Sequence, residues 1–263
     1  MKRVSKNDKN DWKKLKRCLG FLKRTIKDRR IMSADNLTDL YVWIDTSHAV
    51  HDNMQEHTGG VISMGRGALH CKSSAQKINT KSTTESELVG VSEYLPYYIW
   101  FLLFFEAQGY EIKKNMLYQD NESAIKMEIN GRNSCTGNSR HIEIKCFWVK
   151  DRVDRKEVNV RYCPTALMLA DYFTKPLQEA LFKKFRSIIM GYTHIDEIIL
   201  NPLFSIKERI ENVIENNELC HERKTSQRQE SKSPTYADIV TNGRQIKDRN
   251  QRVPRILKSL KVR

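Results

Sequence analysis

The sequence has few of the features that are typical of secreted proteins, membrane proteins or proteins with a structural metal site. Its six cysteines are scattered, and no pair has the Cys-x-x-Cys spacing of a zinc site or redox motif. We therefore expect reduced thiols in an intracellular protein. The first eight residues are charged and contain no apolar core, so no signal peptide is predicted.

Long apolar runs are also scarce. The longest apolar stretch, residues 94–105, is much shorter than a membrane span and contains Pro96. It predicts a buried helix, and we expect no membrane partner. No internal repeat is evident, so nothing indicates a repeat architecture.

Acidic residues are in deficit relative to basic ones. The chain has 263 residues with 46 Lys and Arg against 32 Asp and Glu, which gives a net charge of +14. This length suits one domain with extensions or two small domains. The basic balance favours a polyanionic partner, with nucleic acid first and an acidic membrane second.

Residues 1–38 predict a basic, helical lead-in. Apolar residues recur there at three- and four-residue spacing, and Lys and Arg cover the remaining surface: Trp12, Leu15, Leu19, Leu22 and Ile26 form the apolar stripe. Two interpretations remain open. The basic side is the solvated face of a helix packed on its neighbour, or it contacts a nucleic-acid backbone.

Residues 39–192 alternate between strand and helix patterns. A three-strand meander is predicted over 39–74, with residues 41–44 as a central strand buried on both faces and with turns at 57–60 and 65–67. One helix over 81–109, or two helices meeting at Pro96, comes next. The remaining elements are a strand at 116–118, helices at 121–128 and 139–154, a strand at 158–163, and helices at 164–174 and 177–190.

This order of elements predicts an α/β fold in which a mixed sheet carries helices on its faces. After residue 192 the pattern weakens. Residues 204–219 fit one amphipathic helix, and the polar, basic chain from Cys220 onward predicts disorder. We therefore predict that residues 193–263 form an amphipathic helix and a disordered basic tail.

Acidic residues stand at four junctions between these elements. Asp45 and Asp120 end strands, Glu85 and Glu87 open the helix at 81–109, and Asp171 opens a later one. Any one such acid is commonly a turn or N-cap residue. Together, at the ends of alternating strands and helices, they indicate the carboxylate cluster of a two-metal phosphodiesterase.

Five motifs in fixed order carry a family resemblance. The chain resembles the ribonuclease H domain in the C-terminal part of copia-type LTR retrotransposon polyproteins, through residues 80–88, 118–121, 140–144, 162–165 and 170–177. Residues 57–60 match the family's turn, and the lead-in resembles the segment between reverse transcriptase and ribonuclease H. Because no Tyr-x-Asp-Asp-like motif is present, we expect a fragment that starts after the polymerase.

The resemblance, over roughly residues 10–192, implies the fold and the activity. The expected fold is ribonuclease H-like, with a five-stranded mixed sheet flanked by helices, a helical lead-in and a disordered basic tail. The expected activity is hydrolysis of the RNA strand of RNA–DNA hybrids during reverse transcription, with two Mg²⁺ or Mn²⁺ ions. The expected partners are the hybrid and the reverse transcriptase part of the same polyprotein, in a cytoplasmic particle or the nucleus.

The family pattern also assigns roles to the four acids. Asp45 would bridge both ions, Glu87 and Asp120 would complete one site, and Asp171 would share the second ion with Asp45. Glu85 competes with Glu87, since residues two apart on a helix point about 200° apart. The residues after Glu87, Leu-Val-Gly, fit the family pattern better, which leaves Glu85 to partner the Ser82 cap.

Substrate contacts are expected from Lys and Arg on phosphates and from groups that reach 2′-hydroxyls. The polar residues nearest the acids in the motifs are the candidates: Thr83, Asn121, Arg140 and His141. His141 either approaches the scissile phosphate or is a polar residue at a helix start. Many ribonucleases H have a His just before the last Asp, but residues 162–170 contain none.

A second hypothesis belongs to another class of protein. The chain would then be a truncated, non-catalytic retrotransposon remnant that binds nucleic acid or a partner protein.

Overall fold

A computed structural model of the protein describes residues 8–48, 51, 54–131 and 140–203, without the side chains of Arg140 and His141. The chain divides into two units, residues 1–205 and 206–263. All described residues belong to the first unit. The helix predicted over 204–219 and the tail beyond it lie outside the described residues, and the division at 38 and 192 stays a prediction.

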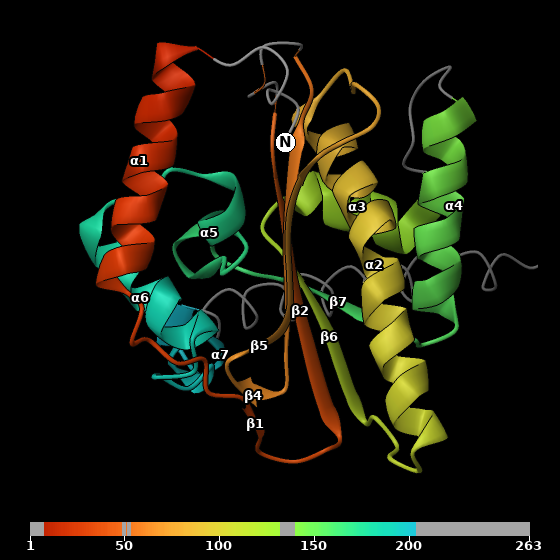
Figure 1. Ribbon diagram of the computed structural model, residues 1–263. Helices are drawn as coiled ribbons and strands as arrows, with labels where there is room; N and C mark the ends of the chain where they lie inside the picture. Colours follow the sequence, from red (N-terminus) through yellow and green to blue (C-terminus); the bar gives the residue numbers. More distant parts are fainter. Residues whose placement is uncertain (1–7, 49–50, 52–53, 132–139, 204–263) are drawn as a thin grey trace, which may run out of the picture. The chain divides into compact units, whose positions relative to one another are not determined.

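Five strands form one mixed sheet (Figure 1), in the order β5 (Ala68–Ala75), β3 (His57–Ser63), β2 (Asp39–Ser47), β6 (Lys114–Gln119) and β7 (Asn159–Tyr162). The strands β5, β3 and β2 pair antiparallel, whereas β6 and β7 continue the sheet in parallel. β1 (Ser33–Ala34) and β4 (Gly65–Arg66) form a separate antiparallel pair. The prediction of an α/β fold with a five-stranded mixed sheet flanked by helices is confirmed.

The central strand β2 separates two hydrophobic cores. Its side chains alternate between the faces, so Leu40, Val42 and Ile44 enter one cluster while Tyr41 and Trp43 enter the other. All five are buried, as predicted for a central strand. A carboxylate at the end of this run is therefore held by a rigid, fully packed element.

Helices cover both faces of the sheet (Figure 1). One face carries α2 (Thr83–Ala107), α3 (Glu122–Asn130) and α4 (Arg140–Asp154), which contribute to the first core. The other carries α5 (Asp171–Thr174), α6 (Glu179–Ile189) and α7 (Asp196–Ile199), which belong to the second core. Ile195 and Ile198, just beyond residue 192, are buried in that second core.

α2 is one continuous helix through Pro96, so the alternative of two helices is wrong. Pro96 lies on the exposed side, while Tyr94, Leu95 and Tyr98 beside it are fully buried. Proline in a helix interior costs about 3 kcal/mol. Burying three large side chains on the sheet offsets that cost, and the helix continues.

α2 is also the one helix in the described part of the chain with the length and composition of a membrane span. It has 25 residues and a mean hydropathy of 1.4 in its most apolar window, 44% of which is buried inside the protein. The core helix of a soluble protein passes the same test, so this is weak evidence for a membrane.

The turn predicted at residues 57–60 is wrong, because these residues lie within β3. Gly59 and Gly60 pair with Asp45 and Ile44 of β2. A Cβ on Gly60 would lie 2.5 Å from the Tyr94 ring, and one on Gly59 would lie 2.9 Å from the carbonyl oxygen of Ala170. The glycines therefore allow neighbouring elements to approach both faces of the strand.

The helix predicted over 164–174 is also only partly correct. The segment forms a 3-10 turn, η2 (Thr165–Leu167), and then the short α5. Between them Met168 has an extended backbone with ψ of 94°. Residues 167–170 are all buried, and a continuous helix would turn some of these apolar side chains towards solvent.

The lead-in forms helix α1 (Lys9–Arg24), which begins at an Asp8 capping box. No residue of α1 is buried, and its apolar stripe is exposed. The lead-in instead joins the sheet domain at the end of this helix, where the Arg186 guanidinium lies 5.8 Å from the centre of the Phe21 ring, and beyond it. There Asp28 pairs with Arg186, and the N–H of Ile31 donates to the carbonyl oxygen of Met190 at 2.8 Å. α1 therefore does not pack its apolar stripe into the described domain. A contact between its basic side and a nucleic-acid backbone stays a prediction.

Candidate active site

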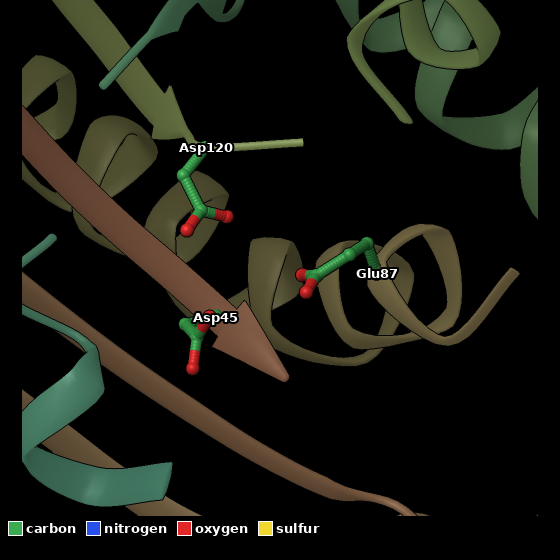
Figure 2. A group of neighbouring side chains, drawn as sticks. All are labelled: Asp45, Glu87 and Asp120. Carbon is green, nitrogen blue, oxygen red and sulfur yellow. The ribbon is translucent and has the colours of Figure 1, made fainter. Parts of the chain in front are cut away.

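Three of the predicted acids meet at one edge of the sheet. Asp45 lies near the end of β2, Asp120 directly follows β6, and Glu87 lies in the second turn of α2. Because β2 and β6 are parallel neighbours, their carboxyl ends reach the same edge. One carboxylate oxygen from each acid lies within 4.8 Å of the others (Figure 2).

The choice between Glu85 and Glu87 follows from the start of α2. The Ser82 hydroxyl accepts the N–H of Glu85 at 3.2 Å, and the Glu85 carboxylate accepts the N–H of Lys81 at 2.9 Å. Glu85 therefore supports the helix start, as expected for a cap partner. Glu87, two residues on, is buried among the acids, and its catalytic role stays a prediction.

The side chain of Gln119 connects two of the acids, a role that the sequence did not assign. Its Nε2 donates to Glu87 Oε2 at 3.3 Å, and its Oε1 accepts the N–H of Asp120 at 2.8 Å. Gln119 is fully buried, so its amide has a fixed orientation. The available signal was its place in the motif, directly before Asp120.

Two threonines complete the hydrogen bonding of these carboxylates. The N–H of Thr46 donates to Glu87 Oε1 at 3.3 Å, and the Thr165 hydroxyl donates to Asp120 Oδ2 at 3.0 Å. In the sequence, Thr46 directly follows the predicted acid Asp45, and Thr165 ends the 162–165 motif. Donors around metal-binding carboxylates fix their orientation.

The fourth acid joins the cluster through a lysine. Asp171 is buried at the first position of α5. The Lys175 ammonium lies 2.8 Å from Asp171 Oδ1 and 3.3 Å from Asp45 Oδ1. The Thr174 hydroxyl donates to the other Asp45 oxygen. Asp171 and Asp45 thus share one cation.

The electrostatics of the site disfavour a full set of negative charges. Burial, followed by the nearby Asp45 and Asp120, raises the pKa of Glu87 well above its ordinary value. Burial and Asp45 raise the pKa of Asp171 to about 7. Burial also raises the pKa of Asp45, against the lowering effect of Lys175. A bound cation would relieve this repulsion.

The residues present therefore fit a hard divalent metal. Mg²⁺ and Mn²⁺ prefer oxygen ligands, and the site offers carboxylate oxygens from Asp45, Glu87 and Asp120 in one place. Asp171, which shares the Lys175 ammonium with Asp45, supplies a further carboxylate.

The predicted substrate residues lie at the starts of three helices. Thr83 is exposed at the first position of α2. Asn121 is the N-cap of α3, and its Oδ1 accepts the N–H groups of Ser123 and Ala124 at 3.0 and 3.1 Å. Its oxygen therefore serves the helix start. Arg140 and His141 begin α4, and their side chains lie outside the described residues.

Comparison with protein families found no matching family model. Comparison with curated proteins found transposon proteins. The chain is 26% identical over 182 residues, 69% of its length, to the retrovirus-related Pol polyprotein from transposon TNT 1-94 of Nicotiana tabacum. It is also 26% identical over 183 residues to that from transposon RE1 of Arabidopsis thaliana. The aligned parts span 14% and 12% of those polyproteins.

Comparison with solved structures found ribonucleases H. LC11-RNase H1, isolated from compost by a metagenomic approach, has a TM-score of 0.39 and 15% identity, covering 56% of this chain and 98% of that one. The same enzyme in complex with an RNA/DNA hybrid gives a TM-score of 0.36. The N-terminal ribonuclease H domain of rv2228c from Mycobacterium tuberculosis gives 0.34, with 12% identity. By sequence, the chain is thus similar to short parts of Pol polyproteins from transposons.

Proposed function

We propose that the protein is a metal-dependent ribonuclease H that hydrolyses the RNA strand of RNA–DNA hybrids during retrotransposon reverse transcription. The observation that carries the proposal is the convergence of Asp45, Glu87 and Asp120 at one sheet edge. The similarity to transposon Pol polyproteins supports the same conclusion. Asp171 completes the predicted set of four acids.

In this proposal Asp45, Glu87 and Asp120 would hold one ion, and Asp45 and Asp171 would hold a second. Two Mg²⁺ or Mn²⁺ ions bound there would activate the attacking water and stabilise the leaving 3′ oxygen. The protein's own contribution is orientation. Gln119 fixes the Glu87 carboxylate and the backbone of Asp120, and Thr165 fixes the Asp120 carboxylate.

Substrate recognition is proposed to rest on phosphates and 2′-hydroxyls rather than on base edges. The net charge of +14 supports a polyanionic substrate. Thr83, exposed at the start of α2 four residues before Glu87, is the described candidate for such a contact. The side-chain oxygen of Asn121 accepts hydrogen bonds in the α3 cap. We therefore propose that its side-chain NH₂ group makes the contact with the hybrid.

The context in which the protein acts is also proposed. The transposon relatives are several times longer than the matched segment, and the reverse transcriptase part of the same polyprotein is the proposed partner. Copia-like particles assemble in the cytoplasm and their DNA product enters the nucleus, so a cytoplasmic particle or the nucleus is the proposed location.

The substrate class can be tested with one set of labelled duplexes. The full chain is incubated with an RNA–DNA hybrid labelled on either strand, with duplex RNA and with duplex DNA, in Mg²⁺, Mn²⁺ or EDTA. The proposal predicts cleavage of the RNA strand of the hybrid alone, and loss of cleavage in EDTA.

Two results would contradict the proposal. Equal cleavage of DNA duplexes would indicate a general nuclease. Hybrid binding without cleavage in either metal would support the non-catalytic remnant instead, with binding measured by gel shift at low salt, where phosphate contacts are strongest.

A further inference from the structure

Lys175 places a cation between two carboxylates of the candidate active site. Its Nζ is 2.8 Å from Asp171 Oδ1 and 3.3 Å from Asp45 Oδ1. These are the two acids to which the proposed function assigns the second metal ion. An ammonium and a divalent ion compete for these two oxygens, because each needs direct contact with them and the two cations repel.

We propose that Lys175 is a built-in cation at the second metal position, which holds Asp45 and Asp171 together and which a second divalent ion must displace. The inference rests on the proposed function, since it concerns the ion pair of that centre. Binding of the first ion, by Asp45, Glu87 and Asp120, would leave Lys175 in place. Binding of the second would require its side chain to leave both carboxylates.

The surroundings of Lys175 suit a movable cation. The side chains of Asp45 and Asp171 are 2% and 4% exposed, whereas that of Lys175 is 36% exposed. Lys175 is the C-cap of the four-residue α5 and has an extended backbone. The carboxylates are therefore fixed, while the long lysine side chain has a route to solvent.

The pair differs from an ordinary surface ion pair of the same spacing. Lys150 lies 2.7 Å from Asp154 in α4, also four residues apart, but that aspartate is 59% exposed and the pair touches none of the acids. Exposed pairs contribute little to stability. Removing the Lys175 ammonium instead leaves two buried carboxylates without their cation, which is strongly destabilising.

The experiment measures Mn²⁺ binding and thermal stability of the full chain without substrate. Wild type, Lys175→Met, Lys175→Arg and the matched control Lys150→Met are titrated with Mn²⁺ by calorimetry and melted in EDTA. We expect wild type to bind one ion tightly and a second weakly. In Lys175→Met the second ion should bind at least about tenfold more tightly, since its competitor and a repelling charge are gone.

Stability should change in the matching direction. Lys175→Met should melt at a lower temperature than wild type in EDTA and recover with Mn²⁺, whereas Lys175→Arg and Lys150→Met should titrate like wild type. If Lys175→Met does not fold in EDTA, Lys175→Gln, which keeps a hydrogen-bond donor, is titrated under the same criteria.

The outcomes separate the two claims. If Mn²⁺ binds wild type and the Lys175 variants with the same stoichiometry and affinity, this inference is wrong while the proposed function stands. If Mn²⁺ binds to none of the proteins, the metal-dependent function itself fails, and the inference fails with it.

Discussion

Gln119 Nε2 donates a hydrogen bond of 3.3 Å to Oε2 of Glu87, which joins the end of β6 to the second turn of α2. The same amide accepts the N–H of Asp120 at 2.8 Å. One fully buried side chain thus sets the position of two of the three converging acids. It is a positioning residue, and it makes no contact with the reacting atoms in the mechanism proposed above.

We expect Gln119→Leu to weaken Mn²⁺ binding and to lower kcat about 10- to 100-fold, the usual effect of losing an outer partner of a metal ligand. KM for the hybrid should change little. Calorimetry and steady-state cleavage measure the two effects. The matched control is Gln76→Leu, because Gln76 is equally buried but bonds to Thr58 and Ser86 and to none of the acids. Normal Mn²⁺ affinity in Gln119→Leu would contradict the positioning role.

Glu87 and Glu85 lie two residues apart on one helix, so the effects of replacing each of them on stability and on Mg²⁺ binding can be compared directly. Burial and neighbouring carboxylates raise the pKa of Glu87, so Glu87→Gln should melt at a higher temperature than wild type in EDTA. The same variant should lose most of the stabilisation that Mg²⁺ gives wild type, about 2.7 kcal/mol at one hundred times Kd.

Glu85→Gln is the control for that pair, since Glu85 belongs to the helix cap. It should keep the full Mg²⁺ stabilisation and lose no more than about 1 kcal/mol of stability. Thermal melts with and without Mg²⁺ measure both variants. A full Mg²⁺ effect in Glu87→Gln would place the ion elsewhere.

Three features of the site could be read from the sequence because they follow local rules. The buried run 41–44 indicated the central strand, Asp45 and Asp120 were predicted at the ends of strands, and helix geometry excluded one of Glu85 and Glu87. These are consequences of periodicity and spacing. The structure agrees with all three placements.

What the sequence did not reveal depends on contacts between distant segments. Gly59 and Gly60 resemble a turn, yet they lie in β3, where they leave room for α2 and the α5 segment to approach closely. Pro96 suggested a break that buried neighbours prevent. Lys175 stood in a quoted motif, but only the fold places its ammonium between Asp45 and Asp171.

Gly59 gives a direct test of this close packing. A Cβ at residue 59 would lie 2.9 Å from both Ala170 O and Phe173 Cβ, so Gly59→Ala should push away the segment that carries Asp171. We expect a loss of about 1–3 kcal/mol of stability and weaker binding of the second Mn²⁺ ion. Gly20→Ala, where nothing lies within 4 Å in α1, is the control and should not be destabilising. Wild-type behaviour of Gly59→Ala would show that the segment can move freely.

Glu128 in α3 should make stability depend on pH. It is fully buried, and burial raises its pKa from 4.5 to about 8, against a smaller lowering effect of Gln119. Because the folded pKa lies above the unfolded one, its stabilising contribution is complete below pH 4.5 and is lost as pH rises towards 8.

The glutamine side chain of Glu128→Gln is neutral at every pH, so the stability of this variant should not fall in that way as pH rises. Relative to the variant, wild type should lose stability between pH 5 and 8 by at most about 1.4 kcal/mol for each pH unit. Urea unfolding at several pH values measures the difference. Near the low end of this range the two proteins should have equal stability, and a constant difference at all pH values would contradict the account.

The central claim is that the converging carboxylates form a hydrolytic metal centre. Its most direct measurement is cleavage of an end-labelled RNA annealed to DNA by wild type and by Asp120→Asn, with Mg²⁺ and with Mn²⁺. The account predicts cleavage by wild type and a loss of about a hundredfold or more in the variant, because a few kcal/mol of transition-state stabilisation corresponds to that factor. Equal cleavage by Asp120→Asn would contradict the assignment of these acids.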